Sequence, residues 1–491
     1  MYVKVLATAD ALTICWEKPE HAPAKACYQV LVNGRPAAQT DKTHATIEGL
    51  APDTDYQLEV MMGEEKLACE AARTRILKRR IDVTQPPYNA LGDGKTLNTK
   101  VLQQAMDDCG PKDCVYLPAG VYMTGALRLH SHMEVYLEEG AVLQGTQEID
   151  DYLPRIPSRF EGTEMICYSS VLNMGSLDHT AGPNCEDVLI HGKGTIASGG
   201  RTLAFRIIED ERIRLKDYLA ELGDKVLECE ILDTIPGRVR PRLINMSNCK
   251  DIRISGLTLR DGASWNVHFV YSRGIVTDHC TFRSVNVWNG DGWDPDSSED
   301  CMLFGCQFFT GDDAVAIKSG KNPQGNEINR PTRNIRIFDC HSAFGHGITI
   351  GSEMSGGVEN VQVWDCDLGN AMFGIEIKGT KKRGGYVRGI HLRDCTVARV
   401  LMHAVGYNDD GIGAPVPPKF SDCTFRNVRI LGKSLDHDNV VSDCPAIELQ
   451  GFDVPGYEVE DVVFKNCSIT RGTEVKMHLC KNITLNLTEV E

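Results

Sequence analysis

The segment Asn334-Ile-Arg-Ile-Phe-Asp-Cys340 recurs downstream as Asn360-Val-Gln-Val-Trp-Asp-Cys366, Gly389-Ile-His-Leu-Arg-Asp-Cys395 and Asp461-Val-Val-Phe-Lys-Asn-Cys467. Each copy alternates apolar and polar residues, which is typical of a short strand, and then makes a polar step to cysteine. A strand-only unit that repeats every few tens of residues indicates a solenoid. We therefore predict an all-β fold, a parallel β-helix whose turns stack about 4.8 Å apart.

Cysteines mark the same repeat. They fall at positions 280, 306, 340, 366 and 395, in steps of 26, 34, 26 and 29 residues. The chain has 19 cysteines, an odd number, and no paired C-x2-C segments of the zinc type. We therefore expect reduced thiols that pack as small apolar side chains in an internal ladder.

Composition excludes several classes of function. The 491 residues contain 52 Lys and Arg against 68 Asp and Glu, a net charge of −16, which argues against nucleic-acid and anionic-membrane partners. No stretch approaches the 18 apolar residues of a transmembrane helix, and 42% apolar residues suffice for a core. The polar start lacks a signal-peptide core, so we expect a cytoplasmic protein, or a secreted or periplasmic one if a leader was removed.

Two domains are expected, residues 1–80 and 81–491. The first has short alternating runs such as Leu12-Thr-Ile-Cys-Trp16, as in a β-sandwich. Its segment Gly49-Leu-Ala-Pro-Asp-Thr-Asp-Tyr56 resembles the end of a fibronectin type III domain. The second domain starts with one helix, whose apolar stripe includes Leu102 and Met106, and the strands that follow show no return to helix.

One part of the repeat is rich in acids. Asn289-Gly-Asp-Gly-Trp-Asp-Pro-Asp296 precedes Thr310-Gly-Asp-Asp-Ala-Val-Ala-Ile-Lys318, and Asp291 lies 21 residues before Asp312, roughly one turn. We therefore expect Asp291, Asp312 and Asp313 to cluster, with at least one pKa raised by like-charge repulsion. Such a cluster suits hydrolysis of a glycosidic bond. A solvated turn or a calcium site is the alternative.

Aligned strands extend this cluster. Val315-Ala-Ile317, Ile348-Thr-Ile350 and Ile375-Glu-Ile377 share one register, in which the Val and Ile side chains face inward. Lys318 and Lys378 then fall in one outward column, and His346 precedes its strand as the Asp pair precedes its own. We expect one external groove that carries acids, a histidine and lysines.

These motifs, in this order, resemble glycoside hydrolase family 28, the polygalacturonases, and within it the bacterial exo-acting type with an N-terminal fibronectin-like domain. The matching segments are Asn289-Gly-Asp291-Gly292, Gly311-Asp312-Asp313, Gly345-His346-Gly347 and Glu376-Ile377-Lys378. The resemblance covers about residues 82–480 and implies a right-handed parallel β-helix, a pectin-lyase-like solenoid.

The resemblance also implies an inverting hydrolase that needs no cofactor or metal. Asp312 would protonate the leaving oxygen, Asp291 and Asp313 would activate the attacking water, and His346 would orient or tune the acid. The substrate-binding candidates are Asn289, Lys318, Glu376, Lys378 and Tyr407. Lys378 would bind a substrate carboxylate as a point charge.

Two positions depart from the family pattern. Glu376 stands where the family has an arginine, and Gly290 where it has a threonine. Arginine binds a carboxylate in a bidentate fork, whereas glutamate repels it. Either the sugar at that subsite is not a plain uronate, or another cation replaces the arginine, or Glu376 pairs with Lys378. The nearby cations are Lys318, Lys321, Lys381, Lys382 and Arg383.

The expected function is therefore an exo-acting galacturonidase whose partner is a pectic oligosaccharide. A long insertion near residues 145–240 is expected to wall off a subsite. Its candidate pocket residues are Pro154, Arg155, Asn184, Arg238, Arg240 and Arg242. The rivals are hydrolysis of another pectic linkage, such as rhamnogalacturonan or a substituted galacturonan, a lyase on the same fold, and a non-catalytic carbohydrate-binding solenoid. The oligomeric state is not predicted.

Overall fold

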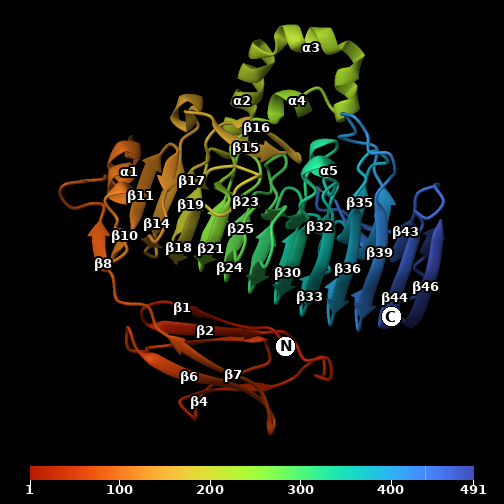
Figure 1. Cartoon of the computed structure of the whole chain (residues 1–491), viewed down its shortest axis with the longest axis horizontal. Helices are drawn as coiled ribbons and strands as arrows, with labels where there is room; N and C mark the ends of the chain where they lie inside the picture. Colours follow the sequence, from red (N-terminus) through yellow and green to blue (C-terminus); the bar gives the residue numbers. More distant parts are fainter. Residues whose placement is uncertain (437) are drawn as a thin grey trace. The chain divides into compact units, whose positions relative to one another are not determined.

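The computed structural model describes residues 1–436 and 438–491, and the chain divides into two units (Figure 1). The first unit comprises residues 1–81 and 109–114, and the second comprises residues 82–108 and 115–491. Within the described residues no helix is long and apolar enough to cross a membrane.

Two antiparallel sheets make up most of the first unit, one in the order β1-β2-β5 and one in the order β4-β3-β6-β7. Their strands are β1 (Val3–Ala7), β2 (Ala11–Trp16), β3 (Tyr28–Val32), β4 (Arg35–Thr40), β5 (His44–Glu48), β6 (Asp55–Met62) and β7 (Glu65–Arg73). The core includes Trp16, whose ring lies edge-on to Tyr28 at 5.3 Å. The small β unit is as expected, whereas its likeness to fibronectin type III stays a prediction.

The second unit is a right-handed parallel β-helix, as the repeat and the family resemblance together predict. Its larger sheet has 24 strands and its smaller sheet has 11, in the order β12-β17-β20-β23-β26-β29-β32-β35-β38-β43-β45. The strands of the smaller sheet are β12 (Leu127–Leu129), β17 (Leu172–Gly175), β20 (Ile244–Ser247), β23 (Val267–Val270), β26 (Trp293–Asp296), β29 (Val315–Ile317), β32 (Gly347–Ile350), β35 (Gly374–Gly379), β38 (Arg399–Ala404), β43 (Ile447–Gln450) and β45 (Val475–His478).

The predicted register of the smaller sheet is confirmed. Ala316 pairs with Thr349, and Thr349 pairs with Glu376 in the next turn. The flanking Val315, Ile348 and the other apolar residues of these strands are at most 2% exposed, because they face the interior of the solenoid. Glu376 is therefore held on the opposite side of the strand by the packing of its apolar neighbours.

Stacked side chains of one kind fill the solenoid. The rings of Phe304 and Phe338 lie 4.9 Å apart and nearly parallel, and Trp364 continues the stack at 4.5 Å. Cysteines 280, 306, 340, 366 and 395 are all buried, and consecutive members of this set interact through their thiols. The predicted internal cysteine ladder is therefore present.

The turns of the larger sheet bend at residues in the left-handed conformation. Asn334 and Asn360 pair in adjacent turns, with φ values of +58° and +54°. The same column continues through Gly389, Asp422, Asp461 and Asn482, all with positive φ. Asp, Asn and Gly tolerate this conformation best, so each turn supplies such a residue at its corner.

One expectation about helices is wrong. Helix α1 (Thr99–Asp107) lies where predicted and buries Leu102 and Met106, but the chain returns to helix later. The further helices are α2 (Gly200–Arg214), α3 (Lys216–Leu222), α4 (Thr234–Gly237) and α5 (Gln324–Ile328), with 3-10 segments η1 (Ile149–Tyr152) and η2 (Gly223–Cys229). Helix α2 buries Leu203, Ile207 and Glu211 at a four-residue spacing, which is a helical period, and it lies within the insertion near residues 145–240.

Candidate active site

A cavity of about 280 Å3 lies over the smaller sheet of the β-helix. All nine residues predicted for catalysis or substrate binding line it: Asn289, Asp291, Asp312, Asp313, Lys318, His346, Glu376, Lys378 and Tyr407. The repeat explains the convergence. Asp291, Asp313 and His346 each precede a strand of that sheet, so successive turns deliver them to one point.

The backbone fixes the spacing of these turns. The amide of Gly292 donates to the carbonyl of Asp313 at 2.9 Å, and the amide of His346 donates to the carbonyl of Asp312 at 3.0 Å. Asn289 is held from behind, because Arg240 donates to its side-chain oxygen at 2.6 Å. The acidic segment is therefore anchored before any substrate arrives.

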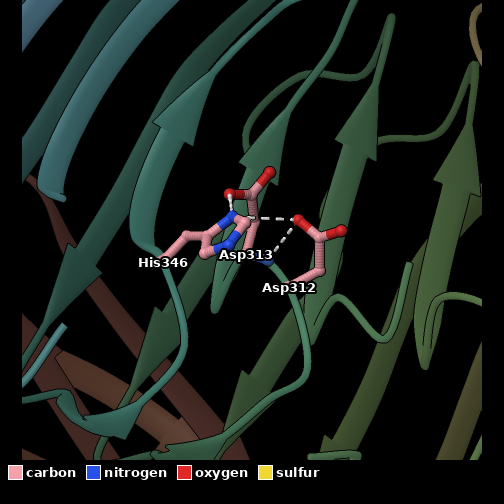
Figure 2. Close-up of side chains that lie close together, drawn as sticks. All are labelled: Asp312, Asp313 and His346. Atoms are coloured by element: carbon pink, nitrogen blue, oxygen red, sulfur yellow. Dashed lines mark hydrogen bonds and ion pairs between the residues drawn. The ribbon is translucent and has the colours of Figure 1, made fainter. Parts of the chain in front are cut away.

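One ring nitrogen of His346 faces both adjacent aspartates (Figure 2). Its Nδ1 is 3.0 Å from Asp312 Oδ1 and 3.2 Å from Asp313 Oδ1. Burial disfavours the imidazolium, but the charge of Asp312 and the hydrogen bonds to both aspartates outweigh it and raise the pKa of His346 to about 10. The imidazole is therefore a cation at neutral pH, and Nδ1 is a donor.

The same three residues form the cluster whose ligand atoms are close enough to hold a metal ion, within 4.8 Å of one another. His346 Nδ1 is also within ion-pair distance of both aspartates, so the same three side chains form an ion-paired triad.

Asp313 is stabilised as an anion. Thr349 donates its hydroxyl to Oδ1 at 2.6 Å, and Lys378 Nζ lies 3.9 Å from Oδ2. Burial opposes ionisation, but Lys378 and His346 together lower the pKa of Asp313 below its ordinary value. These contacts and the lowered pKa both favour the ionised form of Asp313.

Asp291 has the opposite electrostatics. Burial and the charge of Asp294 raise its pKa well above that of an ordinary aspartate, while Lys318, 3.7 Å away, only partly compensates. Its Oδ1 and both oxygens of Asp294 have no hydrogen-bond partner among the described residues. The raised pKa expected for the cluster thus belongs to Asp291 and its neighbour Asp294.

Lys318 is shared between acids on the cavity wall. Its Nζ lies 3.3 Å from Glu353 Oε2 in addition to the contact with Asp291. Glu353 also accepts from Asn408 Nδ2 at 2.9 Å. Burial works against the charge of Lys318, yet Glu353 and Asp291 keep its pKa well above the ordinary value. Lys318 is therefore a cation whose charge is already compensated.

Glu376 makes a second group with Lys378 and His403. Its Oε2 is 3.0 Å from Lys378 Nζ, and its Oε1 is 2.7 Å from His403 Nε2. The pairing of Glu376 with Lys378, one of the three alternatives left by the sequence, is therefore present. The ring of Tyr407 lies beneath the same ammonium, 5.7 Å from Nζ.

Sequence reasoning missed several residues that line the cavity. They are Glu161, Glu230, Thr234, Trp265, Trp288, Glu353, Phe373, His403, Val405 and Asn408, together with Gly351 and Ser352. His403 had a usable signal, because its strand β38 pairs in register with β35 and places His403 beside Lys378. Glu161 and Glu230 lie in segments outside the repeat, so no register could place them.

The candidate pocket residues of the insertion are not among the residues that line the cavity. Arg238 bonds Glu161 and Asp410, and Arg155 pairs with Glu211 of α2. Asn184 bonds the backbone of Ser176. Of the cations proposed to replace the family arginine, Lys321 is bound to Asn408 and Asp410.

Comparison with known proteins identifies relatives for most of the chain. The profile described as "Glycosyl hydrolases family 28" matches residues 173–489. A "Probable polygalacturonase" of Vitis vinifera is 33% identical over 322 residues, which are 63% of this chain and 59% of the relative. An "Exo-poly-alpha-D-galacturonosidase" of Dickeya chrysanthemi is 28% identical over 459 residues, 87% of this chain and 74% of the relative. The chain thus spans less than two thirds of the Vitis relative.

Solved structures agree on the fold. The family 28 exopolygalacturonase of Yersinia enterocolitica superposes with a TM-score of 0.81 at 22% identity, covering 100% of this chain and 98% of that one. The exopolygalacturonase of Thermotoga maritima gives 0.68 at 23% identity, covering 84% and 91%. At these identities the likeness concerns the architecture.

Proposed function

Because the chain belongs to glycosyl hydrolases family 28, we propose that it hydrolyses the terminal bond of pectic oligogalacturonides and releases galacturonic acid with inversion. The observation that carries this proposal is the meeting of Asp291, Asp312 and Asp313 in one cavity. Inverting hydrolysis needs one carboxylic acid to protonate the leaving oxygen and a carboxylate across the bond to activate water.

Action at a chain end is supported by the walls of the cavity. Glu161 comes from the turn between β15 (Ile156–Phe160) and β16 (Thr163–Cys167), and Glu230 and Thr234 come from the helical segment. These segments lie outside the stacked turns, yet they line the same cavity as the catalytic aspartates. A cavity walled in this way accepts the end of a chain more readily than its middle.

Asp312 is the group best placed to protonate the leaving oxygen. Its side chain is 23% exposed, whereas those of Asp313 and Asp291 are 4% and 3% exposed. A general acid must reach the substrate oxygen within hydrogen-bond distance. Asp312 is therefore the proposed acid, and His346 is a positioning residue that fixes its carboxyl.

Asp291 and Asp313 would hold and deprotonate the attacking water. A general base works best when its pKa approaches the working pH, and the raised pKa of Asp291 moves it in that direction. The ionised Asp313, fixed by Thr349, would orient the water through its second oxygen. In this mechanism the acid and base carboxyls stand about 6.5–9.5 Å apart to admit that water.

Substrate binding would use the remaining members of the cavity. Lys378 offers an ammonium to the uronate carboxylate, and Tyr407, Trp265 and Trp288 offer aromatic faces to the sugar ring. The chemistry supplied by these side chains is complete without a cofactor.

Product analysis on saturated di- and trigalacturonate tests the proposal. Release of monomeric galacturonate with a new reducing end, no new ultraviolet absorbance, and a β-anomer detected first by NMR is the expected result. An unsaturated product would indicate a lyase, and internal cleavage of longer chains would contradict end action. Binding of these oligosaccharides by the wild type without turnover would favour a binding function, and unchanged turnover of an Asp312→Asn variant would show that Asp312 is not the acid.

A second candidate is hydrolysis of another pectic linkage, such as that of rhamnogalacturonan or a substituted galacturonan. Glu376 favours it, because an acid lines the cavity where a uronate-binding arginine is the family pattern. Rhamnogalacturonan-derived oligosaccharides therefore belong in the same substrate panel.

A further inference from the structure

Lys318 connects the proposed base, Asp291, to an acid that has no part in the proposed reaction, Glu353. Its Nζ lies 3.3 Å from Glu353 Oε2 and 3.7 Å from Asp291 Oδ2. All three side chains line the cavity, and none is more than 7% exposed. The buried ammonium is therefore shared between two carboxylates, and its shorter contact is with Glu353.

The backbone fixes Glu353 beside Lys318. Lys318 directly follows β29, and Glu353 lies three residues after β32, in the next turn of the solenoid. The amide of Ser319 donates to the carbonyl of Glu353 at 2.7 Å, and the amide of Lys318 donates to the carbonyl of Pro295 at 2.8 Å. The lysine is thus held between the turn that carries Asp291 and the turn that carries Glu353.

The carboxylate of Glu353 is oriented by Asn408. Asn408 Nδ2 donates to Oε1 of Glu353 at 2.9 Å. The amide has one favourable orientation, because its oxygen accepts from Lys321 Nζ at 2.8 Å and from Arg238 at 3.0 Å. Oε1 of Glu353 is thereby occupied, and Oε2 is left to the shared lysine.

Glu353 holds the lysine as an anion. Burial opposes its ionisation, but the charges of Lys318, Arg383 and Lys378 outweigh burial and lower the pKa of Glu353 to about 2. A nearby cation favours the ionised form of a carboxyl group. An ammonium that is drawn toward Glu353 therefore stabilises the anion of Asp291 less than one that is free to approach it.

Asp291 faces charged groups from several turns. They are Asp294 on the strand that follows it, Asp312 and Asp313 in the next turn, Lys318 after β29, and Arg240 in the insertion. Burial and the charge of Asp294 raise the pKa of Asp291, and the charge of Lys318 opposes that rise. The separation of Lys318 from Asp291 therefore controls how basic the Asp291 carboxylate is.

Building on the proposed hydrolysis, we propose that Glu353 is a positioning residue that draws Lys318 away from Asp291, so that Asp291 stays basic enough to activate the attacking water. This role requires no contact between Glu353 and the substrate. Both carboxylate oxygens of Glu353 already have partners, and its influence on the reaction passes through the ammonium. Loss of its charge should therefore weaken the base and leave substrate binding unchanged.

Glu353→Gln tests the proposal, because this variant keeps the shape of the side chain and removes its charge. Lys318 should then approach Asp291 and stabilise its anion, so the acidic limb of the kcat/KM profile should move down by about 0.5–1 pH unit. At the pH optimum, kcat on digalacturonate should fall about two- to fivefold because the base is weaker. KM should stay within about twofold of the wild-type value, as expected for a residue that does not bind substrate.

Glu448→Gln is the matched control. It makes the same change on the same sheet, at a residue that Arg399 binds at 2.6 Å and that does not line the cavity. Its pH profile, kcat and KM should equal those of the wild type. A several-fold rise in KM with an unmoved acidic limb in Glu353→Gln would mean that Glu353 binds substrate, and a fall in kcat with an unmoved limb would mean a purely structural role. Either result would overturn the inference.

A double variant shows whether Glu353 acts through the lysine. Lys318→Met should move the acidic limb upward, because Asp291 loses its neighbouring cation. Adding Glu353→Gln to Lys318→Met should then move the limb no further. Equal downward shifts with and without the lysine would show that Glu353 acts independently of Lys318 and would overturn the inference.

Failure of the underlying function gives a different result. If the wild type releases galacturonate from neither di- nor trigalacturonate, the proposed function is wrong. The crystal structure of Glu353→Gln still decides whether Glu353 holds Lys318 off Asp291. A separation of about 3.0 Å or less between Lys318 Nζ and Asp291 Oδ2 would support that role, and an unchanged separation of 3.7 Å would overturn it.

Discussion

The two sheets of the β-helix use the same turns for opposite purposes. On the larger sheet, polar side chains meet partners one turn away: Asn360 donates to Asn334 at 2.8 Å, and Arg388 pairs with Glu359 at 2.6 Å. On the smaller sheet, Asp291 and Asp294 are buried beside one another with unsatisfied oxygens. The backbone repeat is common to both, so the difference lies in side chains alone.

This difference separates what stabilises the solenoid from what could make it an enzyme. Ladders of paired or stacked side chains repeat the same favourable contact in each turn. The cavity instead concentrates like charges, which costs folding free energy and is typical of functional sites. Removing a group from the cavity should therefore cost activity, and removing one from a ladder should cost stability.

The largest expected effect is on catalysis. Asp312→Asn should lower kcat by about 10²–10⁴-fold, because the proton donor is lost, while the melting temperature stays close to that of the wild type. The matched control is Asp300→Asn on the larger sheet, an exposed residue bonded to Asn334, which should keep full activity. Equal losses of kcat in Asp312→Asn and Asp300→Asn would contradict the proposed distinction between the two sheets.

The next effect is on stability. Phe338→Ala interrupts the ring stack between Phe304 and Trp364 and should lower the free energy of unfolding by about 3–5 kcal/mol. Urea denaturation measures it, and kcat per folded molecule should be unchanged. A tenfold drop in kcat at saturating substrate would show that the ring stack also supports the catalytic step.

A smaller effect has the opposite sign and depends on pH. Burial raises the pKa of Asp294 well above its ordinary value of 3.8, so ionisation penalises the folded state as pH rises above that value. Asp294→Asn should therefore increase the free energy of unfolding at pH 7 by on the order of 1–2 kcal/mol, with little change near pH 4.

Asp278 on the larger sheet is the control for that sign. It is also buried, but Arg253 donates to it at 2.8 and 3.1 Å and helps to lower its pKa. Its stabilisation is present above the unfolded pKa and is lost as pH falls, so Asp278→Asn should destabilise the protein at pH 7. If Asp294→Asn and Asp278→Asn change the free energy of unfolding at pH 7 in the same direction, that result would contradict the electrostatic contrast between the two sheets.

The smallest expected effect comes from an exposed pair. Arg388→Gln breaks the ion pair with Glu359, whose side chains are 56% and 24% exposed. Such pairs contribute about 0–1 kcal/mol because solvent screens them. The change in unfolding free energy should fall in that range and shrink further in 1 M salt, and a loss above 2 kcal/mol would mean that the ladder acts cooperatively.

Much of this organisation could be predicted from the sequence because the repeat is regular. Aligning Val315, Ile348 and Ile375 gave the register, and the register placed Lys378 and Glu376 on the cavity side. Helix α2 was missed because it lies in the insertion near residues 145–240, where the strand repeat gives no register and the buried helical positions include the charged Glu211. Glu161 and Glu230 could not be predicted, since the position of an insertion depends on tertiary contacts such as those of Arg238.

The left-handed corners of the larger sheet bear on how such a molecule changes length in evolution. Every turn from Asn334 to Asn482 carries its own Asp, Asn or Gly at the bend. Each turn therefore contains the residue that its own bend requires. A gene segment that encodes one turn could be duplicated or deleted without disturbing the bends on either side. Growth by whole turns would lengthen the surface available to a polymer while the older columns stay aligned.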